Sequence, residues 1–318
     1  MLFLDLPPMH WDETQLLYHA LGRLDIEALA LTTTIEPYVC VGFSQGIPVE
    51  VDTDYCRKND IGVFRREIGG GTVFIDKDQL LIQLVLKRER GDMPAGQSNL
   101  FRKFLGPVQE TYKAIGMDAE FRPINDLLVK NRKVSGTGGG QVGECNVVAT
   151  NILLDFDFAK MAGALRCPSE EFRLALRRMM EENLTTVKRE TGAMPNIQAL
   201  RKTVRERFEA LLGPMEPAEL PYQVEAEMER IRVELFHRRW VSDKGAKKRW
   251  REVKVRGGCY VVQLPYDGKE VLLEVREEMI TAASVVGASR REKWLDKIVG
   301  QAYCEEQVIN RIAEMATR

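Results

Sequence analysis

The feature that most constrains this chain is a run of three glycines between two apolar stretches typical of β-strands. The segment reads Arg65-Arg66-Glu67-Ile68-Gly69-Gly70-Gly71-Thr72-Val73-Phe74. Glycine lets backbone N–H groups approach a ligand because no Cβ stands in the way, and such a turn beside arginines can cradle a phosphate or a carboxylate. The segment is not a P-loop, and Val73-Phe74 continue as strand rather than opening a dinucleotide-binding helix. The alternative is an ordinary tight turn whose arginines face solvent.

A second glycine-rich segment follows later in the chain. An apolar run leads from Asn125-Asp126 to Lys133, and four of the five residues at 136–140 are glycine. Lysine is a compact point charge suited to phosphate or acyl-phosphate oxygens. Two glycine-rich turns with a lysine and arginines predict a site that holds an anionic ligand between them. The alternative for Lys133 is a solvated side chain on a strand.

The composition excludes several classes of function. Lys and Arg number 46 against 47 Asp and Glu, so the chain does not bind nucleic acid by bulk charge. Six scattered cysteines and three histidines show no metal-ligand spacing, so we expect no metal site in the protein. The few histidines also remove the commonest general base. The N-terminus is not a signal peptide and no apolar run is long enough to cross a membrane, so we expect a cytoplasmic enzyme with no membrane partner.

Apolar spacing predicts helices and strands over the first two thirds of the chain. Expected helices cover 11–30, 97–116, 168–182 and 196–212, and expected strands cover 37–43, 61–66, 80–86 and 151–157. A hairpin is expected around Lys130-Asn131, followed by a glycine-rich loop at 136–140.

A Pro-rich stretch at 213–222 predicts a domain boundary. A charged helix over 223–240 follows, then a strand meander over 252–287 and two final helices at 290–299 and 304–316. We therefore expect an α+β chain in three parts. They are a large domain over 1–215, a linker or helix over 216–240, and a small domain over 241–318.

Four ordered segments resemble the lipoate–protein ligase A family, which shares a superfamily with biotin ligases and octanoyltransferases. They are VGFSQ (41–45), similar to its glycine-glutamine segment; RREIGGGTVF (65–74), similar to its RRxxGGGxVF motif; NDLLVKNRKVSG (125–136), similar to its ND…(R/K)K(I/V)SG segment; and NILLDFD (151–157). The likeness covers about residues 10–195 and is weaker in the tail. It implies a class II synthetase or biotin ligase-like fold: a mixed or antiparallel sheet flanked by helices, with a small C-terminal α+β accessory domain.

The resemblance implies a two-step reaction that uses ATP and Mg²⁺. Lipoate attacks the α-phosphate of ATP, giving lipoyl-AMP and pyrophosphate, and a lysine of a lipoyl-domain or H-like acceptor protein then attacks the activated carbonyl. The resemblance implies that Lys133 is catalytic and contacts both the lipoyl carboxyl group and the phosphate. It also implies a nucleotide- or adenylate-binding set: Arg66, Gly69, Gly70, Gly71, Thr72, Val73, Phe74, Asn125, Asp126 and Gly136.

Two departures from the family pattern concern the same segments. Ile75 stands where many relatives have histidine, so we expect it to pack rather than to bind. The extra glycines at 136–140 predict a more mobile loop. These departures also motivate a third interpretation, a non-catalytic binding protein that retains the pocket.

The alternative enzyme is a cysteine-dependent octanoyl- or lipoyl-transferase that uses no ATP. Cys167 lies 34 residues after Lys133, a spacing that resembles one octanoyltransferase branch, and Cys145 lies in the glycine-rich segment. Glu144 beside Cys145 would raise the pKa of that thiol, which argues against a thiolate nucleophile. Each cysteine can otherwise be a small apolar filler, and the accessory tail favours the ligase. The sequence leaves the preference between lipoate and octanoate open.

The stretch 237–256 holds nine Lys or Arg against two acidic residues, with Trp240 and Trp250 interleaved. This pattern can dock an acidic acceptor domain, form a solvated helix end, or bind nucleic acid. We expect the chain to have no nucleic-acid partner.

Overall fold

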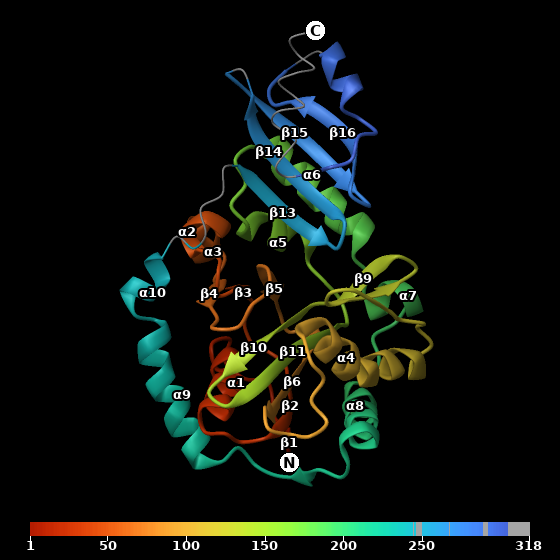
Figure 1. Ribbon diagram of the computed structural model, residues 1–318. Helices are drawn as coiled ribbons and strands as arrows, with labels where there is room; N and C mark the ends of the chain where they lie inside the picture. The colour runs from red at the N-terminus through yellow and green to blue at the C-terminus, as the bar shows by residue number, and fades with distance from the viewer. Residues whose placement is uncertain (244, 246–249, 267, 289–291, 305–318) are drawn as a thin grey trace. The chain divides into compact units, whose positions relative to one another are not determined.

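The computed structural model describes residues 1–243, 245, 250–266, 268–288 and 292–304 (Figure 1). Its contacts divide the chain into two units. The first unit contains residues 1–157 and 185–246, and the second contains residues 158–184 and 247–318. The chain therefore leaves the first unit at residue 157, returns to it at residue 185, and leaves it again at residue 246.

The first unit is built on a six-stranded mixed sheet. Its strands are β1 (Leu2–Asp5), β2 (Ala28–Thr32), β6 (Gln79–Lys87), β10 (Thr137–Val142), β11 (Cys145–Leu153) and β12 (Glu216–Pro217). They follow the order β10-β11-β6-β2-β1-β12, in which β1 is parallel to β2 and β12 and the other neighbours are antiparallel. The sheet confirms the α+β class expected from the sequence.

Four helices cover the two faces of this sheet: α1 (Glu13–Arg23), α4 (Gln97–Ala114), α8 (Ile197–Leu212) and α9 (Tyr222–Leu235) (Figure 1). Residues of α4 and α8 share one apolar core with the sheet, and residues of α1 and α9 share the other. Leu29 of β2 belongs to the first core and its neighbour Ala30 to the second, because successive strand residues point to opposite faces. Four short helices complete the unit: α2 (Ile47–Glu50), α3 (Thr53–Lys58), α7 (Val187–Thr191) and α10 (Arg238–Ser242).

Two small sheets carry the sequence motifs. The first has the order β4-β3-β5, with β3 parallel to β4 and antiparallel to β5. The second is antiparallel, β7-β8-β9, and the turn between β8 and β9 is made by Lys130 and Asn131, both with positive φ, as hairpin turns require. The expected hairpin is therefore confirmed. The strands are β3 (Tyr38–Val41), β4 (Gly62–Arg65), β5 (Val73–Ile75), β7 (Glu120–Arg122), β8 (Asp126–Val129) and β9 (Arg132–Ser135).

The second unit joins helices to an antiparallel sheet of order β13-β14-β15-β16. The helix α6 contacts β13, β14 and β15, and the core includes Val262, Leu273 and Leu295. The expected meander over 252–287 is confirmed. The region of the expected helix at 290–299 contains a short 3₁₀-helix, and the helix expected at 304–316 lies outside the described residues except for its first residue. The elements are α5 (Phe158–Ala164), α6 (Glu170–Asn183), β13 (Arg251–Arg256), β14 (Cys259–Tyr266), β15 (Lys269–Arg276), β16 (Met279–Val285) and η1 (Lys293–Lys297).

Two predictions about local structure were wrong. The helix expected over 11–30 ends at Arg23, and the apolar run at 28–32 forms the central strand β2. The glycine-rich segment at 136–140 is largely strand β10 rather than a mobile loop. Its glycines allow close packing, because a Cβ on Gly139 would lie 2.7 Å from the ring of Phe101.

The contacts divide the chain differently from the expected domains. Residues 216–240, expected as a linker or helix, contain helix α9. They belong to the first unit, since Val224 and Ile231 of α9 are buried in its core. Residues 158–184, expected in the large domain, belong to the second unit. The expected domain limits, taken as the limits of independently folding parts, remain a prediction. Within the described ranges, no helix is both long and apolar enough to cross a membrane.

We expect Gly139→Ala to lower the free energy of unfolding by about 1–3 kcal/mol, because the added methyl group would overlap Phe101 and the Val147 carbonyl. Gly106→Ala is the matched control. A Cβ on Gly106 in α4 meets no atom within 4 Å beyond its own stretch of helix, and alanine stabilises a helix interior by about 0.5–1 kcal/mol. Urea denaturation measures both changes. Equal stability of the two variants would contradict the close packing of β10 on α4.

Candidate functional site

The guanidinium group of Arg66 organises the triple-glycine loop. Arg66 follows β4 and is only 5% exposed. Its Nη2 donates to the carbonyls of Gly69 at 3.1 Å and Gly71 at 2.8 Å, and its Nη1 donates to the carbonyl of Cys40 at 3.2 Å. Among the described residues no carboxylate forms an ion pair with Arg66. Its positive charge is therefore stabilised by carbonyl dipoles, and two loop carbonyls turn toward it.

The amide groups of this loop are free to bind a ligand. The N–H of Gly69 donates to the carbonyl of Gly139 at 3.2 Å, which joins the two glycine-rich segments. The part of the chain that the structure describes offers no hydrogen-bond partner to the N–H groups of Gly70, Gly71 and Thr72. Gly70 and Gly71 are exposed. Consecutive unpaired N–H groups in front of a buried cation are an arrangement that attracts anions.

Glycine is required at two points of this arrangement. Gly70 has a φ of +113°, which L side chains rarely adopt. A Cβ on Gly42 would lie 1.9 Å from the carbonyl oxygen of Gly70. Gln45 links Gly42 to the loop, because its Oε1 accepts hydrogen bonds from the N–H of Gly42 and from the hydroxyl of Thr72, each at 3.1 Å.

The neighbouring Arg65 has a different role from Arg66. Its Nη1 lies 2.9 Å from Asp243 Oδ2, and its guanidinium carbon lies 4.4 Å from the ring centre of Trp240. The indole N–H of Trp240 donates back to the Arg65 carbonyl at 3.0 Å. Arg65 therefore ties the segment after α9 to β4, and its charge is balanced by Asp243.

Lys133 forms an ion pair with Asp126 across the β8–β9 hairpin. Lys133 Nζ lies 2.7 Å from Asp126 Oδ1, and the Asp126 side chain is 3% exposed against 19% for Lys133. A buried carboxylate paired with a lysine holds the ammonium group in position. The N–H of Thr185 also donates to the Lys133 carbonyl at 2.8 Å, which fixes the strand.

Polar side chains in apolar strands connect the hairpin to the glycine loop. Asn151 Oδ1 accepts from the N–H of Gly136 at 2.7 Å, and its Nδ2 donates to Gln79 Oε1 at 2.7 Å. Gln79 in turn donates to the carbonyl of Phe74 at 3.1 Å. Asn125 donates to the carbonyl of Thr137 at 2.6 Å.

The predicted site residues did not include Gln45, Gln79 or Asn151, although Gln45 was part of the glycine-glutamine segment that resembles the family. For the last two the available signal was a polar residue in an apolar run, since buried polar groups need partners.

Comparison with known proteins identifies the family of this chain. Residues 7–209 match the model of the lipoyl protein ligase A/B catalytic domain. The chain belongs to the lipoyl protein ligase A/B family. The protein is therefore an enzyme of the lipoate ligase and octanoyltransferase family, and lipoate or octanoate as substrate and a lipoyl-domain protein as acceptor fit that family.

Relatives of both kinds resemble this member of the family. The octanoyltransferase LipM of Halalkalibacterium halodurans is 24% identical over 252 residues, which cover 72% of this chain and 91% of the relative. A solved bi-partite lipoate protein ligase of Thermoplasma acidophilum has a TM-score of 0.68 at 22% identity, covering 78% and 98% of the two chains. A solved lipoate-protein ligase A bound with ATP has a TM-score of 0.60 at 21% identity, covering 72% and 93%. The two structures show that the fold is that of lipoate ligases.

The aromatic end of the RRxxGGGxVF motif is buried in this family member. Phe74 is 3% exposed, and its ring meets that of Phe156 edge-on at 6.1 Å between centroids. Val73 packs against the core of α1 and α9, and Ile75 is buried in that core. Ile75 therefore packs, as expected. Val73 and Phe74 can present only backbone and limited side-chain surface to a ligand.

The two candidate cysteines lie in different units. Cys145 is fully buried at the start of β11, and burial, with Asp25 and Glu27 adding to it, raises the pKa of its thiol to about 11. It lies six residues along β11 from Asn151, or about 20 Å along the strand. Burial and the raised pKa both argue against a thiolate nucleophile there. Cys167 is partly exposed and belongs to the second unit.

Part of the basic stretch at 237–256 lies outside the described residues, namely 244 and 246–249. Of its two tryptophans, Trp240 stacks on Arg65 in the first unit, and Trp250 packs against the core of the second unit.

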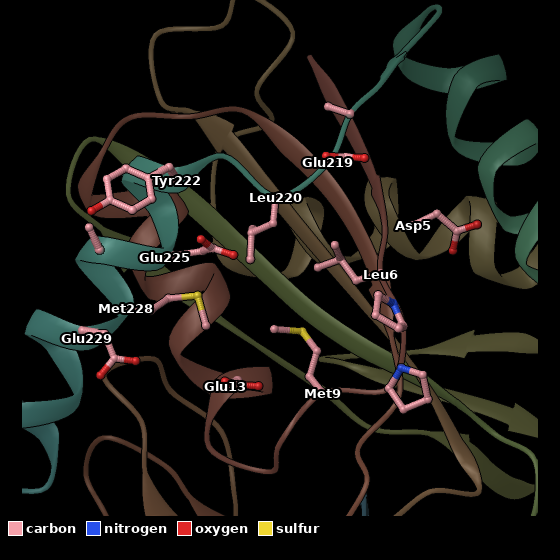
Figure 2. A pocket seen from close by; sticks show the side chains of 14 residues that line it. Asp5, Leu6, Met9, Glu13, Glu219, Leu220, Tyr222, Glu225, Met228 and Glu229 are labelled. Carbon is pink, nitrogen blue, oxygen red and sulfur yellow. The ribbon is translucent and has the colours of Figure 1, made fainter.

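A groove in the first unit lies apart from these motifs. It has a volume of about 760 Å³, and Figure 2 shows side chains from the β1 end and from the beginning of α9 around it. Apolar and acidic residues line it, and none of them was predicted as a site residue. They are Asp5, Leu6, Pro7, Pro8, Met9, Glu13, Ala218, Glu219, Leu220, Tyr222, Glu225, Ala226, Met228 and Glu229.

Asp76 follows β5 and has a perturbed carboxyl group. Burial, with the charge of Asp78 adding to it, raises its pKa to about 6. Its Oδ1 accepts from the N–H of Asp78 at 3.1 Å and from Gln79 at 3.4 Å. The folded state raises this pKa, so it binds the proton of Asp76 more tightly than the unfolded chain does. The free energy of unfolding therefore decreases as the pH rises through about 6.

We therefore expect Asp76→Asn to raise the melting temperature at about pH 8 and to have a much smaller effect near pH 4, where wild-type Asp76 is largely protonated. Asparagine stays neutral and keeps an acceptor oxygen for Asp78 and Gln79. Calorimetry of both proteins across this pH range gives the comparison. Asp54→Asn, at an exposed surface carboxylate, is the control. A stabilisation by Asp76→Asn that is independent of pH would contradict the raised pKa.

Proposed function

We propose that the protein is an ATP-dependent lipoate–protein ligase. The observation that carries this proposal is the row of unpaired N–H groups at Gly70, Gly71 and Thr72 in front of the buried Arg66 guanidinium. Such a row suits the phosphate oxygens of a nucleotide or acyl-adenylate. A thioester-forming transferase passes through no acyl-adenylate, so a phosphate-binding row beside the reacting acyl group favours the ligase.

In the first step, the lipoate carboxylate attacks the α-phosphate of ATP and pyrophosphate leaves with the P–O bond electrons. Two anions must meet, so a positive charge between them lowers the barrier. We assign this charge to Lys133. The buried guanidinium group of Arg66 adds a second positive charge from behind the loop. The residues expected to line the nucleotide are Gly69, Gly70, Gly71, Thr72, Asn125 and Gly136.

Asp126 gives Lys133 a counter-ion before substrate arrives. The incoming carboxylate or phosphate oxygen competes with Asp126 for the ammonium group, so Lys133 is never left as an unpaired, partly buried charge. This exchange keeps an anionic group next to Lys133 throughout the proposed reaction.

In the second step, the ε-amine of an acceptor lysine attacks the lipoyl carbonyl and AMP leaves. Lys133 stabilises the negative charge that develops on the carbonyl oxygen. The amine loses one proton as the amide forms. We expect the acceptor to carry a lipoyl-type domain.

The described residues form no protein cage for the Mg²⁺ expected with ATP. Among the described residues, no group of three or more His, Cys, Asp or Glu side chains is placed to hold a metal ion. Mg²⁺ commonly binds through substrate phosphates and water, so we expect it to enter with ATP and to neutralise phosphate oxygens.

The second candidate function is a cysteine-dependent octanoyl- or lipoyl-transferase. The LipM relative favours it, since it matches 72% of this chain, and Cys167 is partly exposed. In that reaction a thiolate takes the acyl group and passes it to the acceptor lysine without ATP.

Incubation with lipoate, ATP, Mg²⁺ and a lipoyl-domain acceptor tests the proposal. A ligase releases pyrophosphate and adds the mass of the lipoyl group to the acceptor only when ATP is present. Acyl transfer from an acyl carrier protein without ATP, lost in Cys167→Ser or Cys145→Ser, would establish the transferase instead. Binding of lipoate with neither reaction would support a non-catalytic binding protein.

We expect Lys133→Ala to lower the rate of pyrophosphate release by at least about 100-fold, because a single preorganised group that stabilises developing charge contributes that much. Lys130→Ala is the matched control, since Lys130 lies on the same hairpin, is 74% exposed, and pairs with Glu190 rather than Asp126. Steady-state kinetics of both variants, with melting temperatures to confirm folding, make the comparison. Turnover retained in Lys133→Ala would remove Lys133 from the mechanism.

A further inference from the structure

His19 connects helix α1 to the arginine–glycine loop. Its side chain is completely buried, and both ring nitrogens have partners. Nδ1 lies 2.7 Å from the carbonyl of Gln15 in the same helix, and Nε2 lies 3.1 Å from the backbone N–H of Glu67. A carbonyl can only accept and an N–H can only donate, so the partners fix the neutral tautomer with hydrogen on Nδ1.

The surroundings of His19 keep the ring neutral. Burial, with the charges of Arg23 and Arg66 adding to it, lowers its pKa to about 3, while the hydrogen bond to Gln15 opposes this shift. The carboxylate of Glu67 faces the ring too, with Oε2 at 3.8 Å from Nε2. Nε2 therefore stays available as an acceptor over the whole range of pH in which the protein is expected to work.

The N–H that His19 accepts belongs to the peptide bond between Arg66 and Glu67. Fixing this peptide fixes the direction in which the Arg66 side chain leaves the backbone. On the other side, the carboxylate of Glu67 pairs with Arg23 Nη2 at 3.0 Å, and Arg23 is also on α1. Helix α1 therefore holds Glu67, which lies between Arg66 and the three glycines, through both the backbone N–H and the carboxylate of Glu67.

We propose that His19 is a positioning residue for the site. It orients the Arg66–Glu67 peptide, so that the Arg66 side chain points inward and donates hydrogen bonds to the carbonyls of Gly69 and Gly71. The N–H groups of the loop then face the ligand. His19 touches no substrate. The inference rests on the proposed function for its kinetic consequence, whereas the ordering of the loop is independent of which acyl-transfer reaction the enzyme performs.

Tyr18 provides a matched control for a purely structural role. It is fully buried next to His19 and stacks on it with ring centroids 4.3 Å apart. Its hydroxyl donates to Gln15 Oε1 at 2.9 Å and makes no bond to the loop. Tyr18→Phe therefore removes one buried hydrogen bond from the same helix but leaves the Glu67 amide untouched.

The test combines hydrogen exchange of the loop with steady-state kinetics of the full chain. Three substitutions at His19 are compared with wild type and Tyr18→Phe: His19→Phe and His19→Leu, which lack an acceptor and differ in size, and His19→Gln, which keeps a donor and an acceptor. Backbone amide exchange is followed by mass spectrometry in the peptide covering 66–72. Kinetics use ATP, lipoate and a lipoyl-domain acceptor.

We expect exchange in this peptide to accelerate in His19→Phe or His19→Leu and KM for ATP to rise about tenfold, with partial recovery of both in His19→Gln. Tyr18→Phe should lower the melting temperature with neither change. Three results would overturn the proposal: a Glu67 amide in wild type that exchanges as fast as an exposed one, loop exchange unaltered in a folded variant without the acceptor, or equal changes in Tyr18→Phe. If wild type shows no ATP-dependent activity, the proposed function fails, and the exchange data alone still decide the positioning role.

Discussion

The structure of the site depends on one buried cation that has no acidic partner among the described residues. Arg66 is stabilised by the carbonyl oxygens of Cys40, Gly69 and Gly71. Burying a guanidinium group is costly unless its donors are satisfied, so the loop must fold around it. The N–H groups of Gly70, Gly71 and Thr72 are left without partners among the described residues, which supports the proposal that the loop binds an anion.

The positive charges of the two motifs are thus divided among distinct tasks. Arg65 is balanced by Asp243 and covered by Trp240, so it contributes to folding rather than to binding. Arg66 orients the carbonyl groups of the loop, and its buried positive charge lies behind the loop. Lys133 is a partly exposed cation paired with Asp126, and we propose that a substrate anion replaces this carboxylate. Polar residues buried in the strands, Gln79 and Asn151, connect the two segments.

Much of this could be predicted from local sequence. Glycine runs, the Asn-Asp start of the hairpin and the turn at Lys130-Asn131 depend on neighbouring residues, and they were predicted. Long-range packing decides the rest. Position 139 of β10 requires glycine because Phe101 of a distant helix lies against it. Cys145 is in the core because β11 begins there. The role of His19 could not be predicted, since its partner, the Glu67 amide, is 48 residues away. The scarcity of histidine indicated a mechanism without a histidine base, yet one histidine has a place beside the loop.

Mass spectrometry of the enzyme after one turnover without acceptor tests the central claim most directly. The protein is incubated with lipoate, ATP and Mg²⁺, and the same sample is measured under native and denaturing conditions. A loop built to hold a phosphate predicts a bound lipoyl-AMP that adds mass under native conditions and is lost on denaturation. A lipoyl group that persists after denaturation and maps to Cys167 or Cys145 would contradict the account.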